Sequence, residues 1–297
     1  MELGIFKDEW SRDPTKTLYH YTAQAGLLGI IKDQAVWATH TQYLNDTKEY
    51  RHAVDVATAE INKRLVHAVG DSHRILSDMA EGVKGIENTN VCVCSFSEDR
   101  DSLSQWRAYG GSTSGYAIGF NPLHLAEMVR QEGFHLAPCL YKPAEQVAVI
   151  EALVDKVLDQ NLERLRNGET LVGPNQEEWL AAPKLMLPRG GNLAAYLHRL
   201  APILKDESFS EEKEWRIISE PLMCTRERFS FRVGNSMLIP YYSIPIARSD
   251  RPLKLDEVVV SPTPHIEQSA IAVQSFLVGQ KLENVPVKPS AIPYRNW

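Results

Sequence analysis

Two kinds of hydrophobic pattern alternate along the chain. Short runs of β-branched and aromatic residues predict strands, and longer stretches whose apolar residues recur every three or four positions predict helices. The expected strands cover residues 17–21, 35–39, 91–94, 116–120, 137–141, 213–219, 229–233, 237–244 and 255–261. The expected helices cover residues 23–33, 49–69, 72–83, 122–131, 144–166 and 266–277, with further helical sequence in 176–204. Because strands and helices come in mixed order, we expect an α+β fold with mixed, mostly antiparallel sheets.

The chain of 297 residues is expected to form a single domain over residues 1–297. Helical segments at about 49–83 and 144–205 lie between predicted strands, so we interpret them as insertions rather than as a separate domain. The composition, with 43% hydrophobic and 24% charged residues, is ordinary for a globular protein that buries a sizeable core without disulfides.

Charge and cysteine usage narrow the class of protein. The formal net charge of −6 argues against a basic surface over the whole molecule, although it allows a local basic groove. The four cysteines form no CxxC pair and no signal-peptide pattern precedes them, so we expect reduced thiols and a cytoplasmic location. No apolar run approaches the roughly 20 residues needed to cross a bilayer, so no membrane contact is expected.

Residues 91–120 contain the first group of candidate functional residues. A buried strand is followed by a polar loop, and Leu103, Trp106 and Arg107 then fall at helical spacing. A short helix here should present Trp106 and Tyr109 together. A glycine-rich turn and a second strand complete a wall suited to a ligand cleft.

His20 lies at the end of a predicted strand, just before a helix for which Thr22 is a suitable N-cap. A histidine at this place can bind an anionic or polar ligand, or it can simply hydrogen-bond the adjacent loop. The sequence leaves both interpretations open.

A second group lies in residues 208–220, where Glu212, Glu214 and Arg216 share one face of a predicted strand. In a cleft they would form an acid/base or substrate-orienting set, with Arg216 lowering the pKa of a neighbouring carboxyl. On an open surface they would only be a charged edge.

Several common catalytic motifs are missing from the sequence. It contains no GxGxxG opening a helix, no GxxxxGK[ST], no HExxH, no GxSxG and no Cys/His cluster with metal-ligand spacing. A metal-dependent nuclease would have to rely on Asp46, Glu98, Asp99 and Asp101, and we expect no metal.

Several sequence blocks occur in an order that resembles a known family. They are LYHYT (18–22), VWATH (36–40), YLNDTKE (43–49), CSFSE (94–98), SQWRAYGG (104–111), GYAIGF (115–120), EEKEWRII (211–218), VVVSP (258–262) and SAIPYR (290–295). Together they resemble the bacterial domain of unknown function 2971 family over nearly the whole chain, from about residue 18 to residue 295.

A more distant resemblance, to the DNA-modifying toxin and RNA phosphotransferase branches of the ADP-ribosyltransferases, implies an ADP-ribosyltransferase-like fold and a mechanism. In that family a strand histidine holds the ribose of NAD, a tyrosine stacks on nicotinamide, and a glutamate orients the ribose and assists attack by the acceptor. The resemblance places His20 in the first role and Glu214, or alternatively Glu212, in the third.

The same resemblance implies that Tyr109 or Trp106 stacks on nicotinamide and that Arg107 or Arg100 contacts the pyrophosphate. Tyr21 and Thr22, next to His20, complete the implied cofactor-binding residues. The chemistry suits these residue types, because loss of nicotinamide leaves an oxocarbenium-like ribose that a carboxylate stabilises. A flat aromatic ring holds the departing base.

The expected function is therefore NAD-dependent ADP-ribosyl transfer or NAD cleavage, in a toxin or a phage-defence effector. NAD is the substrate, and the acceptor is a protein, DNA, RNA or water. The alternative is a non-catalytic sensor that binds a nucleotide or a phage protein in the same cleft without turnover.

Overall fold

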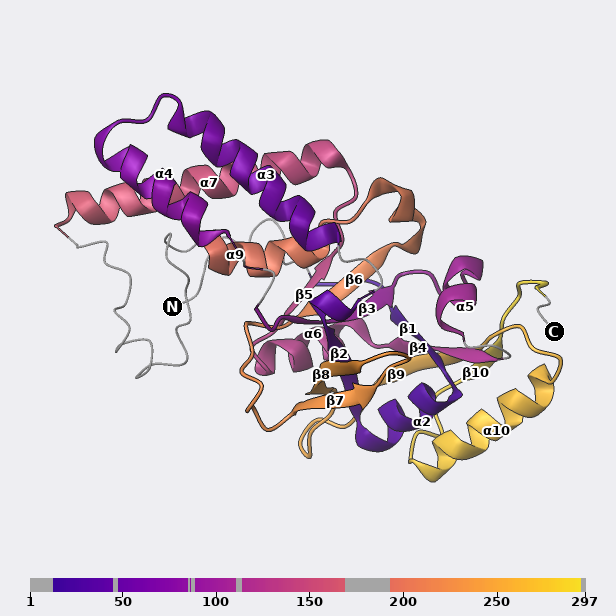
Figure 1. The fold of residues 1–297 in the computed structure, drawn as a ribbon. Coiled ribbons are helices and arrows are strands. Elements are labelled where there is room, and N and C mark those ends of the chain that lie inside the picture. The colour runs from indigo at the N-terminus through magenta and orange to yellow at the C-terminus, as the bar shows by residue number, and fades with distance from the viewer. Residues whose placement is uncertain are drawn as a thin grey trace.

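A computed structural model of the chain describes residues 13–44, 48–84, 86, 89–110, 114–168 and 193–294. Asn45 and Asp46, and the helical sequence predicted between residues 176 and 192, lie outside these described residues. The described part combines one extended β-sheet with several helices (Figure 1). The α+β class is thereby confirmed.

The sheet has ten strands among the described residues. They are β1 (Leu18–Ala23), β2 (Ala35–His40), β3 (Cys92–Ser97), β4 (Gly115–Phe120), β5 (His135–Pro138), β6 (Glu214–Ile218), β7 (Phe229–Val233), β8 (Leu238–Pro245), β9 (Leu255–Val260) and β10 (Val287–Pro289). The strand order is β10-β9-β4-β1-β3-β2-β8-β7, with β6 pairing with both β3 and β5. Every pair is antiparallel except β9 with β10, so the mixed, mostly antiparallel sheet is also confirmed.

The sheet forks at β3. One edge of β3 pairs with β6 over residues 93–97. The other edge is shared, because β1 pairs with it at Ser97 and β2 pairs with it at Cys92 and Val93. β1 and β2 therefore separate from each other along β3, and the edge of β3 between Val93 and Ser97 pairs with neither of them.

Apart from one short helix, α5 (Leu103–Tyr109), whose Trp106 packs with Tyr19 and Tyr21, the described helices form two groups on the two faces of the sheet (Figure 1). The helices of these two groups are α2 (Gln24–Asp33), α3 (Lys48–Leu65), α4 (Gly70–Gly82), α6 (Pro122–Gln131), α7 (Pro143–Arg166), α9 (Leu193–Leu200) and α10 (Ile266–Gly279). Apolar residues of α2, α6 and α10 share one core with Leu18, Phe96 and Ile217 of the sheet. Apolar residues of α3, α4, α7 and α9 share a second core with Val93 and Ile218. Neighbouring strand residues thus enter different cores, as side-chain alternation requires.

Two local predictions at the candidate site are wrong. Strand β6 begins at Glu214 rather than at Lys213, because Lys213 adopts a left-handed conformation (φ 42°) that ends the short 3₁₀ helix η5 (Glu207–Glu212). Glu212 therefore does not lie on the strand. Thr22 does not cap α2, because β1 continues to Ala23, which occupies the N-cap position without a side-chain hydrogen bond.

Candidate functional site

Four charged side chains meet where β6 begins, and we call them the glutamate cluster: Lys205, Glu212, Glu214 and Arg216. Glu214 Oε1 accepts a hydrogen bond from Arg216 Nε at 2.7 Å, and Oε2 accepts one from Lys205 Nζ at 2.5 Å. Lys205 Nζ also binds Glu212 Oε2 at 2.5 Å. Lys205, Glu214 and Arg216 are buried, so each charge depends on these partners to compensate for its lost hydration.

The cluster keeps Glu214 ionised. Burial acts to raise the pKa of Glu214, but the charges of Arg216 and Lys205 and their hydrogen bonds outweigh it and lower the pKa to about 2. Burial likewise acts to lower the pKa of Lys205, and the charge of Glu214 outweighs it and raises that pKa above its usual value. Glu214 and Lys205 therefore both carry their charges at neutral pH.

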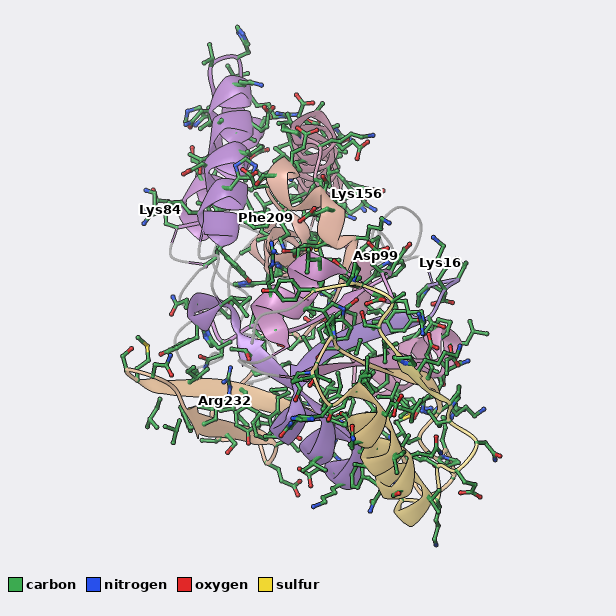
Figure 2. The ribbon with its side chains drawn as sticks, turned by 90° about the vertical axis from the view of Figure 1, so that its right-hand side faces the viewer. Lys16, Lys84, Asp99, Lys156, Phe209 and Arg232 are labelled. Atoms are coloured by element: carbon green, nitrogen blue, oxygen red, sulfur yellow. The ribbon has the colours of Figure 1, made fainter. Side chains whose placement is uncertain are left out.

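Two partly exposed aromatic rings lie beside this cluster. Tyr109, the last residue of α5, is 42% exposed, and its pKa is raised by burial and by the charges of Glu212 and Glu214. Phe209 of η5 is 39% exposed, and Lys205 Nζ lies 5.0 Å from the centre of its ring. Figure 2 shows Phe209 on the segment between the helices and the sheet. The charges of the two glutamates thus act on one partly exposed aromatic residue, and Lys205 contacts the ring of the other.

His20 lies at the fork of the sheet, on β1. Its Nδ1 donates a hydrogen bond to the backbone carbonyl of Ser95 at 2.9 Å. Ser95 lies on the stretch of β3 that pairs with neither β1 nor β2, so this bond gives its carbonyl a partner. Its ring lies 5.6 Å from that of Phe96, and burial lowers its pKa below the usual value. A neutral histidine that binds adjacent backbone is the second interpretation left open by the sequence.

The structure does not bring His20 together with the glutamates. Tyr19, Ser97 and Glu214 lie side by side across β1, β3 and β6, so their side chains share one face of the sheet. His20, the next residue after Tyr19, projects from the opposite face. No hydrogen bond or ion pair joins His20 to either glutamate within the described part of the chain.

Tyr21 and Trp106 are in contact with each other, but both are buried. Their rings meet edge to face, with centres 4.6 Å apart. Tyr21 Oη donates to the carbonyl of Asp99 at 2.6 Å, and Trp106 Nε1 donates to Asp101 Oδ1 at 2.7 Å. Both residues brace the loop before α5. Since Trp106 is only 4% exposed, it offers no ring face for stacking, and Tyr109 is the better candidate.

The remaining candidates contact residues outside the cluster. Arg100 Nε binds Glu257 Oε1 at 2.8 Å, on the far side of β1 from β6. The guanidinium of Arg107 lies 4.9 Å from the ring centre of Tyr294. Thr22 is paired with Tyr116 in the sheet.

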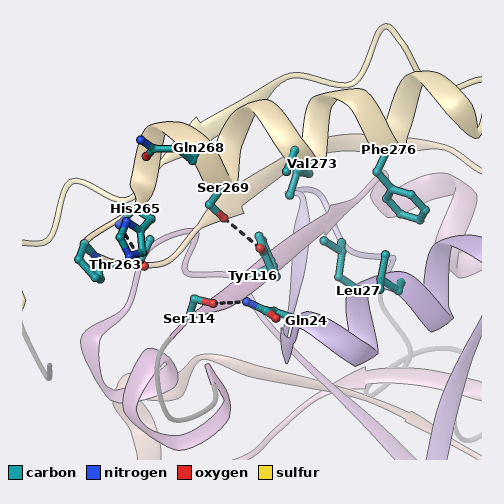
Figure 3. Close-up of a pocket in the computed structure, with 13 residues that line it drawn as sticks. Gln24, Leu27, Ser114, Tyr116, Thr263, His265, Gln268, Ser269, Val273 and Phe276 are labelled. Carbon is teal, nitrogen blue, oxygen red and sulfur yellow. Dashed lines mark hydrogen bonds between the residues drawn. The ribbon is translucent and has the colours of Figure 1, made fainter.

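A separate pocket of about 590 Å³ lies between α2 and α10 (Figure 3). Leu27, Val273 and Phe276 form its apolar part, while Gln24 Nε2 donates to Ser114 Oγ at 2.7 Å near its polar end. None of the described residues that line it is Asp, Glu, Lys or Arg. Apart from His265, the described lining therefore offers no cationic side chain to balance the phosphates of a dinucleotide.

The segment that builds the glutamate cluster is also the one that comparison with known families identifies. Residues 105–217 match the family described as Protein of unknown function (DUF2971). No curated protein and no solved structure matches the chain. The DUF2971 match runs from α5 to β6, so it contains Tyr109, Phe209 and all four residues of the cluster, whereas His20 lies outside it.

Two residues of this DUF2971 segment, Lys205 and Phe209, were not predicted as site residues. Lys205 precedes a polar turn and lies nine positions before Glu214, a spacing with no helical or strand periodicity. The only signal in the sequence was the group of three glutamates at 211, 212 and 214, which need nearby cations if they are buried.

Of the acidic residues considered for a metal site, the three that the structure describes do not cluster. Glu98 binds Lys16, Asp99 binds Lys213, and Asp101 binds Trp106 and Ser290, each in a separate interaction. Within the described ranges no group of His, Cys, Asp or Glu side chains is arranged to hold a metal ion. None of the described helices combines the length and apolar character needed to cross a membrane.

Proposed function

We propose that the chain is an NAD-using ADP-ribosyl transferase or a related NAD-cleaving enzyme whose active centre is the glutamate cluster. The observation that supports this proposal is that the ionised Glu214 carboxylate, with Glu212 held near it by Lys205, acts electrostatically on the partly exposed Tyr109. An aromatic face and a carboxylate are the two groups that cleavage of the nicotinamide–ribose bond uses.

In the proposed reaction the C–N bond between nicotinamide and C1′ of the ribose breaks, and nicotinamide leaves with the bonding electrons. The positive charge that develops on the ribose is stabilised by the carboxylate of Glu214 or Glu212. The nucleophile of the acceptor then bonds to C1′ and loses its proton to a carboxylate or to solvent. If water is the acceptor, the same steps hydrolyse NAD.

The two glutamates differ in how they could take part. Glu214 is buried and both of its oxygens are occupied by Lys205 and Arg216. The side chain of Glu212 is more exposed, at 16% against 6%, and has Lys205 as its cation. Glu212 is therefore better placed to touch a ribose, and Glu214 to position Lys205. Because His20 projects from the opposite face, the proposal assigns it no contact with this ribose.

Such an activity would suit a toxin or an antiviral effector that acts in the cytoplasm on a macromolecular acceptor. The second candidate, a nucleotide-binding sensor without turnover, is favoured by one observation. Both oxygens of the Glu214 carboxylate are bound by Lys205 and Arg216, as in an ion-pair network that is purely structural. A carboxylate bound in this way is not free to take part in a reaction.

Incubation of the purified protein with NAD, followed by measurement of free nicotinamide, tests the proposal. We expect release that falls at least about 100-fold in Glu212→Gln or Glu214→Gln. Glu211→Gln should retain activity, because Glu211 is an exposed glutamate beside the cluster. Tyr109→Phe should keep the aromatic ring that stacks on nicotinamide. Tyr109→Ala removes that ring and should raise the KM for NAD.

Circular dichroism of each variant separates loss of activity from loss of folding. Absence of nicotinamide release, even when cell extract supplies acceptors, would overturn the enzyme proposal. NAD binding detected by calorimetry in that case would support the sensor instead.

A further inference from the structure

Three described strands, β5, β7 and β10, have a neighbour on one side only, and they differ in how their free edges are protected. β10 has three residues and ends at Pro289, and β5 has four residues and ends at Pro138. Short length and proline both prevent a free edge from pairing with another chain. β7 has five residues, Phe229–Val233, and contains no proline. It is the least protected of the three edges.

The hairpin formed by β7 and β8 also exposes apolar side chains. Phe231 is 55% exposed, Val233 is 87% exposed, and Leu238 on β8 is 63% exposed. Val233 pairs with Leu238 and Phe231 with Pro240, so these side chains lie on one face of the hairpin. Figure 2 shows this hairpin, with Arg232 labelled, projecting from the body of the molecule. A contiguous exposed apolar patch of this kind marks an interaction surface.

The backbone of β7 has hydrogen-bonding groups directed away from β8. Ser243 N–H donates to the carbonyl of Arg228, and Gly234 N–H donates to that of Met237, so the even-numbered residues of this strand face β8. Phe231 lies opposite Pro240, which has no N–H. The odd-numbered residues therefore present their N–H and C=O groups to the open edge.

One of these outward groups already has a partner. Phe229 N–H donates to the carbonyl of Arg226 at 2.8 Å. The groups left for another strand are both backbone groups of Phe231, both of Val233, and the carbonyl of Phe229. Within the described part of the chain nothing hydrogen-bonds to them.

We propose that β7 pairs with β7 of a second copy of this chain, antiparallel about a twofold axis at Phe231, so that one sheet continues through a homodimer. In this register the two Phe231 residues exchange N–H···O=C bonds. Val233 N–H of each copy donates to the carbonyl of Phe229 in the other. These four bonds use all of the free groups except the carbonyl of Val233 in each copy. That carbonyl stays unpaired because Phe229 N–H, which lies opposite it, keeps its bond to Arg226.

The sequence of β7 makes a second copy the best occupant of this edge. Phe-Ser-Phe-Arg-Val alternates apolar and polar residues symmetrically about its centre. In the twofold register Phe231 meets itself, Phe229 meets Val233, and Ser230 meets Arg232, so no like charges face each other. Such self-complementarity is what a twofold interface requires.

Light scattering coupled to size-exclusion chromatography measures the mass and tests this inference. The wild type should elute at twice the chain mass of 33.5 kDa. Phe231→Pro removes an N–H that the β8 ladder does not use, so the hairpin should persist while the dimer's dissociation constant rises at least about tenfold. Ile271→Lys is the control, because Ile271 is 68% exposed on α10, away from this edge, and this variant should remain dimeric.

A charge-exchange pair keeps the test independent of any folding defect. Phe231→Lys and Phe231→Glu each place like charges at the twofold axis, so each alone should have the single-chain mass, and an equimolar mixture should recover the double mass. A wild type of single-chain mass at about 100 µM, well above the Kd of a specific interface, would overturn the inference. So would a Phe231→Pro variant that associates as tightly as the wild type.

Discussion

At the residue scale, Lys205 holds the glutamate cluster together. It is 6% exposed and is the only cation that contacts both Glu212 and Glu214 among the described residues. Lys205→Met preserves much of the side-chain volume but removes the charge. Glu214 then keeps only Arg216 as a cationic partner among the described residues, and Glu212 loses the ion pair with Lys205. We therefore expect the free energy of unfolding to fall by about 3 kcal/mol.

Urea unfolding at pH 7 measures this loss. Lys16→Met is the matched control, because Lys16 also pairs with a glutamate, Glu98, but is 69% exposed. The free energy of unfolding of Lys16→Met should fall by less than about 1 kcal/mol. Equal effects of the two substitutions would show that the buried cluster contributes no more to stability than a surface ion pair.

We expect His198 on α9 to make the protein sensitive to mild acid. It is 1% exposed, and burial lowers its pKa from 6.5 to about 4, against a smaller raising effect from the charge of Glu220. Since the folded-state pKa lies below the unfolded value, protonation favours unfolding. The stability due to a neutral His198 is complete above pH 6.5 and is lost as the pH falls toward 4, by about 3 kcal/mol.

Urea midpoints between pH 7.5 and pH 4 test this dependence. Between pH 7.5 and pH 4 the free energy of unfolding of His198→Gln should fall by about 3 kcal/mol less than that of the wild type, whatever the variant's stability at pH 7.5. His73→Gln, which changes an exposed histidine, should follow the wild-type profile. Parallel profiles for wild type and His198→Gln would exclude His198 as the source of the acid sensitivity.

At the element scale, local pattern predicted most strands and helices, because each depends on its own sequence. The hairpin of β7 and β8 and the helix α7 match the predicted segments closely. The fork at β3 was not predicted. Which strands share an edge depends on pairing between residues far apart in the chain, and strand propensity carries no information on that.

Helix α5 shows the same limit at the candidate site. The sequence predicted a short helix that presents Trp106 and Tyr109 together, and the helix is present. The two rings differ in exposure. Trp106 is buried, because it packs against Tyr21 and binds Asp101, whereas Tyr109 lies at the exposed end of the helix. Spacing placed both rings on one side of the helix, but burial against β1 determined which of them a ligand could reach.

The two glutamates and Arg216 could be found from the sequence because acidic residues next to an arginine on a strand form an unusual pattern. Lys205 and Phe209 could not, since they reach the cluster through the turn of η5. The left-handed conformation of Lys213 is also invisible in the sequence, because glycine or asparagine usually marks such a position.

At the scale of the whole molecule, the helices inserted between strands unfold together with the sheet if their core is continuous with it. Ile150 of α7 is fully buried in the core that also contains Val93 and Ile218 of the sheet. We expect Ile150→Ala to lower the free energy of unfolding by about 3 kcal/mol. Ile271→Ala, the same change at an exposed position, should cost less than about 0.5 kcal/mol.

Two probes in the same urea titration decide whether the unfolding is shared. Far-UV circular dichroism follows mainly the helices, and alkylation of Cys92 and Cys94, both buried in β3, follows the sheet. Because the core containing Ile150 joins the two parts, Ile150→Ala should lower both midpoints by the same amount. If it lowered only the dichroism midpoint, the helices would unfold as an independent unit. The inserted helices would then form a separate domain, connected to the sheet only through the chain.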